Sequence, residues 1–121
     1  MTETQYTKRF DLEERTLKFA REVRGFVKEL PKTISNLEDG QQLIRSSGSI
    51  GANYIEANES LSKKDFAMRI KICRKEAKET RYWLNLVDVR DNSDIEKCRE
   101  KLIQESTELM SIFGAIVRKL E

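Results

Sequence analysis

Apolar residues recur along most of the chain at steps of three and four positions, which is the spacing of an amphipathic helix. The pattern is clearest beyond Ser62, where the steps alternate regularly between four and three residues. The resulting seam contains Phe66, Ile70, Cys73, Ala77, Thr80, Leu84 and Val87. A heptad seam of this kind is typical of helices that pack at shallow angles in antiparallel bundles. It predicts a long helix that begins at Ser62 and carries Asp65 in its first turn.

Two more helices are predicted before this one. The first runs from about residue 12 to residue 30, with Asp11 as its cap and Pro31 at its end. Its apolar face contains Leu12, Thr16, Phe19, Ala20, Val23, Phe26, Val27 and Leu30. The second runs from about residue 35 to residue 58 and opens with Ser35-Asn-Leu-Glu38, which has the form of a capping box.

A fourth helix is predicted to run from Ser93 to the C-terminus, opening with a further capping box, Ser93-Asp-Ile-Glu96. Its main seam contains Ile95, Cys98, Leu102, Leu109, Ile112, Ile116 and Leu120. A second apolar row lies beside it and contains Ile103, Met110, Phe113 and Val117. Together the two rows cover about 180° of the helix, which is more than one core stripe requires. We expect the second row to contact another chain, so the pattern predicts a homo-oligomer.

Four helices joined by short loops predict an all-α protein, an antiparallel up-down-up-down four-helix bundle. The 121 residues fit a single domain that spans residues 1–121. Residues 1–9 are polar and are expected to form a frayed N-terminal tail. One proline and five glycines are too few for a β fold with many turns.

The composition narrows the chemistry that such a bundle can perform. The chain contains no histidine, which excludes Ser–His and Cys–His nucleophile pairs and imidazole metal ligands. The two cysteines, Cys73 and Cys98, are 25 positions apart and resemble neither a metal site nor a disulfide framework. They fall at apolar positions and are predicted to pack as small core residues. We therefore expect no enzymatic activity, no metal and no cofactor.

Nothing in the sequence suggests export or a membrane partner. The N-terminus lacks the basic and apolar regions of a signal peptide. The longest apolar run, from Ile112 to Val117, is far shorter than the stretch of about 20 residues that a membrane span needs. We expect a soluble cytoplasmic protein.

The second predicted helix contains a stretch that is rich in small residues. Gly48 and Gly51 would each cost about 1 kcal/mol in a helix interior relative to alanine. A phosphate-cradling loop is one explanation, but Gly-Ser-Ile-Gly matches neither GxxxxGK[ST] nor GxGxxG. We favour a close approach between two helices, or a mild kink, at this point.

Five polar residues of the second and third helices are predicted to form a partly buried structural network: Arg45, Asn53, Glu56, Glu76 and Glu79. Glu56 follows Asn53 by three positions, as Glu79 follows Glu76, so each pair shares a helix face. Carboxylates inside a bundle can hold two iron ions, but those sites use Glu-x-x-His motifs. A carboxylate pair for glycoside hydrolysis is a further alternative, although no inserted loop is present to form a pocket.

The third helix also carries a basic stripe opposite its seam, within an arc of about 120°. The stripe consists of Lys64, Lys71, Arg74, Lys75, Lys78 and Arg81. Residues 63–81 include eight basic and three acidic residues, a local balance of +5 against +2 for the whole chain. Such a stripe can neutralise phosphates, but a solvated face with salt bridges, such as Lys75 with Glu79, explains it equally well. Tyr82 and Trp83 end the stripe; they could stack on bases, although packing in a core or interface is favoured.

Several stretches resemble a known family. They are Phe10-Asp-Leu-Glu-Glu-Arg15, Leu43-Ile-Arg-Ser-Ser-Gly-Ser-Ile-Gly-Ala-Asn-Tyr-Ile-Glu-Ala-Asn58, Ser62-Lys-Lys-Asp-Phe66 and Ile70-Lys-Ile-Cys-Arg-Lys-Glu-Ala-Lys-Glu79. The family is that of the bacterial 23S rRNA intervening-sequence proteins, which are four-helix bundles. The resemblance implies assembly into a ring-like homopentamer and no established enzymatic activity. A similar bundle is the accessory variability protein of diversity-generating retroelements, which contacts reverse transcriptase and nucleic acid.

The favoured function is that of a non-enzymatic, oligomeric accessory protein that binds RNA or DNA. The basic stripe would contact phosphates without reading base sequence, and self-association would repeat the stripe and raise avidity. The alternative is a scaffold for protein–protein interaction that binds an acidic partner and no nucleic acid. A metal-dependent hydrolase that uses Glu56, Glu76 and Glu79 is the least favoured possibility.

Overall fold

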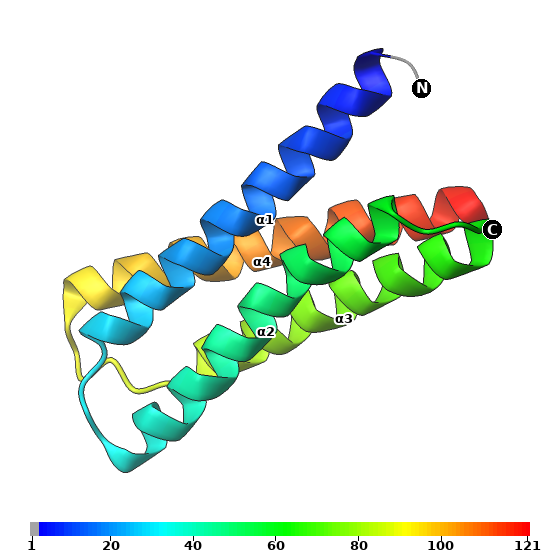
Figure 1. Ribbon diagram of the computed structural model, residues 1–121. Coiled ribbons are helices and arrows are strands. Elements are labelled where there is room, and N and C mark those ends of the chain that lie inside the picture. The colour runs from blue at the N-terminus through cyan, green and yellow to red at the C-terminus, as the bar shows by residue number, and fades with distance from the viewer. Residues whose placement is uncertain (1–2) are drawn as a thin grey trace.

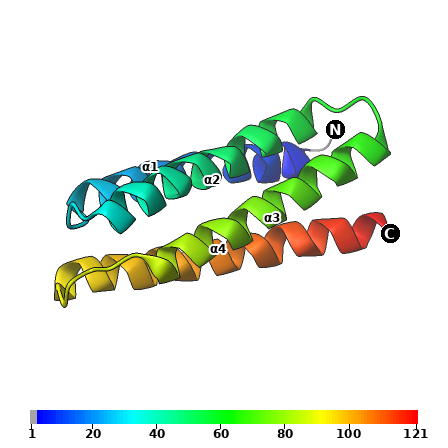
Figure 2. The ribbon, with the colours of Figure 1, turned by 90° about the horizontal axis from the view of Figure 1, so that it is seen from below.

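The computed structural model describes the backbone of residues 3–121 and the side chains of residues 11–121. Within that range it contains four α-helices and no strand. They are α1 (Glu3–Glu29), α2 (Ile34–Asn58), α3 (Lys63–Leu86) and α4 (Ser93–Leu120). Consecutive helices run in opposite directions and α1 also lies beside α4, so the four close into an antiparallel bundle (Figures 1 and 2). The predicted all-α four-helix bundle is confirmed.

The first helix begins earlier than the sequence pattern predicts. It starts at Glu3 rather than near residue 12, so residues 3–9 are helical instead of a frayed tail, and Asp11 lies inside the helix rather than capping it. Residues 3–11 contain neither proline nor glycine, so no residue there interrupts the helix. The first two residues of the expected tail lie outside the described residues.

Side-chain caps fix where the other three helices begin. Ser62 caps α3 as predicted, because its hydroxyl accepts a hydrogen bond from a backbone N–H three residues further on. The caps of α2 and α4 lie slightly earlier than predicted: Thr33 replaces Ser35, and Asn92 replaces Ser93. In α4 the Asn92 side chain accepts hydrogen bonds from two successive backbone N–H groups. Ser93 already lies in the first turn of the helix and does not accept these hydrogen bonds.

One cluster of apolar side chains, drawn from all four helices, forms the core. The seam predicted for the third helix is confirmed, since six of its residues are buried and Phe66 is partly buried. The six are Ile70, Cys73, Ala77, Thr80, Leu84 and Val87. No helix within residues 3–121 combines the length and the apolar character that crossing a bilayer requires.

The buried face of α4 differs from the prediction. Phe113 and Val117, which were expected to meet a second chain, are 0% and 3% exposed and belong to the core of the bundle. Ile103 and Met110, the rest of that row, are partly buried and pack against the same core. Ser106 is also buried, so the seam of α4 passes through positions 102, 106, 109, 113 and 117. Phe113 and Val117 are thus part of the protomer's core, which corrects the prediction that they meet a second chain, while for Ile103 and Met110 this contact stays a prediction.

The helices are not packed equally closely. A Cβ atom added at Gly40 would lie 3.0 Å from Val27, and one added at Gly51 would lie 2.8 Å from Thr16, so α1 and α2 touch closely. Since α2 is continuous through this stretch, the close approach is confirmed and a phosphate-cradling loop is excluded. Contacts between α1 and α4 are the fewest, and the N-terminal turns of α1 rise away from the bundle (Figure 1).

Candidate nucleic-acid interface

The basic stripe of α3 lies on the outer surface of the bundle. The buried face of α3 is turned toward the core, and the stripe occupies the opposite side of the helix. Its exposed members are Lys64, Lys71, Arg74, Lys75 and Lys78, whereas Arg81 is partly buried.

Two arginines form the edge of the stripe that adjoins α4. Nη1 of Arg81 donates a hydrogen bond to Oγ1 of Thr107 at 3.3 Å, which anchors this guanidinium to the neighbouring helix. Cδ of Arg74 lies 3.8 Å from the point where a Cβ would stand at Gly114. The missing side chain at this glycine leaves room for the aliphatic part of Arg74 to lie against α4.

Most of the positive charges in the stripe are not paired. Lys75 has its Nζ atom 3.9 Å from Oε1 of Glu76. The pair with Glu79 suggested by the sequence is not formed, because Arg45 holds that carboxylate. The remaining four basic residues of the stripe form no ion pair among the side chains of residues 11–121. They are Lys64, Lys71, Arg74 and Lys78.

Two of the three acidic residues of α3, Glu76 and Glu79, are turned toward α2, where one arginine holds both. Nη1 of Arg45 lies 3.0 Å from Oε2 of Glu76, and Nη2 lies 2.5 Å from Oε1 of Glu79. The indole N–H of Trp83 donates a further hydrogen bond to Glu79 at 3.3 Å. We call Arg45, Glu76, Glu79 and Trp83 the Arg45 network.

Within the Arg45 network, the pKa values of Glu79 and Arg45 are both shifted toward the charged form. Burial alone would raise the pKa of Glu79, but the hydrogen bonds from Arg45 and Trp83 outweigh this effect and hold the pKa below its usual value. The hydrogen bond with Glu79 in turn raises the pKa of Arg45. Glu76 is the most deeply buried member, with only 5% of its side chain exposed. The network therefore places a fixed guanidinium between two carboxylates at the α2–α3 seam.

The two remaining members of the predicted polar network lie elsewhere. Asn53 accepts a hydrogen bond from Nη1 of Arg69 at 3.0 Å, and its own amide donates to Ser49. Glu56 is exposed, and its carboxylate has no hydrogen bond or ion pair among the described side chains. The carboxylates of Glu56, Glu76 and Glu79 are thus not brought together at one site. The described residues contain no group of three or more potential metal ligands.

The aromatic pair at the end of the stripe is divided between two environments. Tyr82 is 59% exposed, so it does not pack in the core of the protomer, and its packing in an interface stays a prediction. Trp83 is partly buried against the core. The two rings meet edge to face, with centroids 5.0 Å apart and an interplanar angle of 80°. One aromatic face is therefore accessible beside the lysines.

Residues 8–115 match the sequence profile of the family described as 23S rRNA-intervening sequence protein. The chain belongs to this family. A crystal structure of a protein of unknown function, from the S23 ribosomal protein family of Bacteroides thetaiotaomicron VPI-5482, has the same fold, with a TM-score of 0.76. The two sequences are 30% identical, and the match covers 92% of this chain and 98% of that chain. No curated protein is similar enough to count as a match. The resemblance found in the sequence is confirmed.

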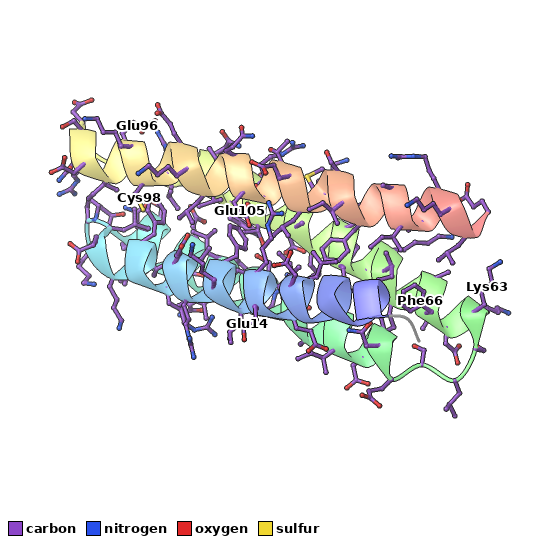
Figure 3. All side chains as sticks on the ribbon, turned by 90° about the horizontal axis from the view of Figure 1, so that it is seen from above. Glu14, Lys63, Phe66, Glu96, Cys98 and Glu105 are labelled. Atoms are coloured by element: carbon purple, nitrogen blue, oxygen red, sulfur yellow. The ribbon has the colours of Figure 1, made fainter. Side chains whose placement is uncertain are left out.

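The sequence pattern does not reveal a second charged contact, which joins α1 to α4. Nε of Arg15 lies 2.7 Å from Oε2 of Glu105, and Nη2 lies 3.1 Å from Oε1 of Glu108. These hydrogen bonds raise the pKa of Arg15. Glu105 extends from α4 toward α1 (Figure 3). The spacing of Glu105 and Glu108 places both on one helix face, but no pattern within α4 indicates which residue of another helix lies opposite.

Proposed function

We propose that this protein is a non-enzymatic accessory protein that binds nucleic acid through the basic stripe of α3. The observation that carries the proposal is that most of the stripe is exposed and has no carboxylate partner among the described side chains. A lysine that is already paired must give up its ion pair before it binds a phosphate, and these lysines need not. The family is named for intervening sequences of 23S rRNA, so RNA is the first nucleic acid to test.

The stripe has a length suited to a nucleic-acid backbone. Lys64, Lys71 and Lys78 are spaced by seven residues, which places them on one side of α3 and about 10 Å apart along the helix. The three lysines therefore cover about 20 Å, which corresponds to about six nucleotides along one strand of a duplex. Contacts of this kind neutralise phosphates and do not distinguish one base from another.

The Arg45 network contributes by removing negative charge from the binding surface. Glu76 and Glu79 lie on the same helix as the stripe and would oppose phosphate binding if they faced outward. Arg45 holds both carboxylates on the α2 side of α3. The outward face of α3 is consequently more positive than the composition of the helix alone implies.

Self-association is part of the proposal, because repeating the stripe around an oligomer would raise avidity without new contacts. The surface responsible must differ from the row at Phe113 and Val117, which is buried. Exposed apolar side chains on α1 and α2, namely Leu17, Ile34, Leu37 and Ile55, offer another surface. Static light scattering tests this point: a mass of 14.2 kDa at micromolar concentration would refute oligomerisation.

The main experiment measures RNA binding across a range of salt concentrations. The protein is titrated onto a labelled RNA duplex and onto single-stranded RNA of the same length, both without a chosen sequence. The triple variant Lys71→Glu, Arg74→Glu, Lys78→Glu should weaken binding at least about 100-fold at low salt and reduce the salt slope by about three. Unchanged binding by this variant would show that the stripe is not the interface.

A matched control separates a local effect from one of net charge. Arg21, Lys28 and Lys32 are exposed and lie on α1 or in the loop that follows it, away from α3. Changing all three to glutamate alters the net charge by the same amount as the triple variant. This control should lose only the modest affinity that a general change in charge removes. Equal losses in both triple variants would contradict a localised interface.

The alternative function, a scaffold that binds an acidic protein partner, gives a different result. RNA binding would be weak and independent of the stripe, while the same triple variant would lose the protein partner. The accessible ring of Tyr82 provides a second distinction. If RNA is the ligand, Tyr82→Ala should weaken single-stranded RNA binding about tenfold through lost stacking and leave duplex binding almost unchanged.

A further inference from the structure

The seam between α1 and α4 contains a cavity of about 650 Å³ that no role described above uses. The apolar half of its lining consists of Gly25 and Phe26 of α1 together with Ile95, Cys98 and Leu102 of α4. Phe26 and Leu102 form the deepest part, since they are only 3% and 2% exposed. A volume of this size is within the range of about 300–1,000 Å³ that small-molecule sites occupy.

Gly25 is the residue that the fold itself does not explain. Glycine is, after proline, the least favourable residue in a helix interior, and this position lies well inside α1. At Gly51 a close neighbour accounts for the glycine, whereas a Cβ added at Gly25 would have no protein atom within 4 Å. Its backbone is ordinary helix, so no unusual conformation calls for glycine either. A side chain at position 25 would thus meet no neighbouring helix and would extend into the open space of the cavity.

The polar groups around the cavity are mainly acidic. Glu22 and Glu29 of α1 and Asp94 of α4 line it, against one basic residue, Lys101. Glu22 lies 3.7 Å from Lys18 in an exposed pair, while Glu29 and Asp94 have no ion pair among the described side chains. The Cys98 thiol, which extends from α4 toward α1 (Figure 3), has its pKa raised by burial and by the negative charge of Glu22. The lining of the cavity thus carries three carboxylates against one ammonium group.

We infer that this cavity is a binding site for a small organic cation. An apolar body, such as one or two fused rings, fills the space beside Gly25 and packs on Phe26 and Leu102. The positively charged group of the ligand lies toward Glu22 and Glu29 at the rim. An apolar interior with a few charged groups at its edge is the usual construction of a site that takes such a ligand. This site is separate from the basic stripe, which lies on α3.

The first measurement compares two fluorescent probes that differ in the sign of their charge. Berberine is a flat apolar cation, and anilinonaphthalene sulfonate is an apolar anion; both become brighter on leaving water. Berberine should bind saturably at micromolar concentration with one site per chain, and at least about tenfold more tightly than the anion. The absence of saturable berberine binding below millimolar concentration would overturn the proposal, as would equal affinity for both probes.

Two substitutions at one position separate lost space from lost structure. Gly25→Ala should raise the Tm by about 4 °C, because alanine favours the helix, and should retain most of the berberine affinity. Gly25→Leu should also retain the fold, since its side chain extends into open space, but should fill the cavity and lower the affinity more than about tenfold. If Gly25→Leu is stable and still binds berberine normally, the cavity is not the site.

Cys98 reports whether the probe occupies this cavity. Cys98 is partly exposed, whereas Cys73 is buried, so N-ethylmaleimide should modify Cys98 alone in the folded protein. Saturating berberine should slow the modification of Cys98 at least about fivefold, as followed by mass spectrometry. An unchanged rate would show that the probe binds elsewhere and would overturn the assignment.

A charge test completes the set. The double variant Glu22→Gln, Glu29→Gln should weaken berberine binding and leave the binding of the anion unchanged or improved. The matched control is Asp11→Asn, Glu14→Gln, which removes two carboxylates from the neighbouring cavity of about 560 Å³. Equal effects of the two double variants would contradict the assignment. A second copy of the chain would be the occupant instead if N-ethylmaleimide modifies Cys98 slowly without any probe, at protein concentrations where the unchanged protein self-associates and Gly25→Leu stays monomeric.

Discussion

Toward both of its neighbours α2 presents small residues, whereas α1 and α4 face each other across two cavities. Gly40 and Gly51 allow α1 to lie close to α2, and buried Ser46 lies 2.8 Å from the hydroxyl of Thr80 on α3. Between α1 and α4 the cavities have volumes of about 650 Å³ and 560 Å³. A third cavity, of about 640 Å³, lies between α1 and α2 beside Gly48 and Gly51. The two seams therefore differ in how closely small residues let the helices approach, and not in whether a cavity is present.

The same charged motif occurs in both places, which makes the difference instructive. Arg45 lies between two glutamates at the α2–α3 seam, and Arg15 lies between two glutamates at the α1–α4 seam. Glu76 is only 5% exposed in the first motif, while the glutamates of the second are 25% and 49% exposed. Arg45 is itself 50% exposed and Glu79 is 32% exposed, so the two motifs differ in Glu76 alone. Removing the partner of a buried carboxylate is costly, whereas an exposed ion pair contributes little. Local burial, and not the identity of the residues, should decide what each motif is worth.

The largest effect is expected from the same truncation in the two seams. Ile70 is fully buried on α3, and Ile95 is partly buried on α4 beside the larger cavity. Ile70→Ala should lower the free energy of unfolding by about 4 kcal/mol, and Ile95→Ala by about 1 kcal/mol. Urea denaturation followed by circular dichroism measures both. Similar losses for the two variants would show that the α1–α4 seam is packed as tightly as the rest.

The contrast between the seams could be predicted from the sequence only in part. The heptad seam of α3 is correct because its residues alternate in steps of four and three, which leaves one helix face for the core. The close approach of α1 at Gly51 is also correct, since small residues in a helix commonly mark such contacts. Both predictions depend on pattern within a single helix, which the sequence contains directly.

The errors concern relations between helices. A buried serine is not distinguishable by pattern from an exposed one, so Ser106 was left out of the α4 seam and Phe113 and Val117 were assigned to a partner chain. Similarly, no spacing indicates that Arg15 meets Glu105, because the two are 90 positions apart. The cavity beside Gly25 was missed for the same reason, since the width of a seam depends on how two helices are placed.

The second comparison changes glycine to alanine on the two sides of α1. A Cβ at position 51 would lie 2.8 Å from Oγ1 of Thr16, whose hydroxyl is held by hydrogen bonds to the backbone carbonyls of Leu12 and Glu13. Gly51→Ala should therefore destabilise the fold by about 2 kcal/mol. Gly25→Ala, which meets no neighbour, should stabilise it by about 1 kcal/mol.

Thermal or urea unfolding of the two glycine variants gives opposite signs if the seams differ as described. A change in the neighbour supplies a control: Thr16→Ala removes Oγ1, the atom that the new Cβ would meet, so Gly51→Ala should cost less in the Thr16→Ala background than in the unchanged protein. Two variants that shift stability in the same direction would contradict the contrast.

The third comparison removes the central arginine from each charged motif. Arg45→Met should cost about 1.5 kcal/mol, since it leaves the buried carboxylate of Glu76 with only Lys75, 3.9 Å away. Arg15→Met should cost about 0.5 kcal/mol, because water from the adjoining cavity can solvate Glu105 and Glu108. Chemical denaturation at neutral pH measures both values, and a larger loss for Arg15→Met would reverse the expected order.

The smallest effect is the pH dependence of that third comparison. Because the Arg45 and Trp83 hydrogen bonds hold the pKa of Glu79 below its usual value, the folded protein binds fewer protons here than the unfolded chain does. The stabilisation is complete above the ordinary pKa of a glutamate, about 4.5, and is lost as the pH falls through the lower pKa of the folded state. The loss of unfolding free energy caused by Arg45→Met should therefore become smaller between pH 7 and about pH 3 in urea titrations.

The loss caused by Arg15→Met should change less with pH. Hydrogen bonds from Gln104 and Arg15 also lower the pKa of Glu108, but this carboxylate is half exposed and well screened. If the loss of unfolding free energy in Arg45→Met stays constant with pH, the hydrogen bonds to Glu79 do not stabilise the fold. In that case burial of Glu76 would be the one difference between the α2–α3 motif and the α1–α4 motif.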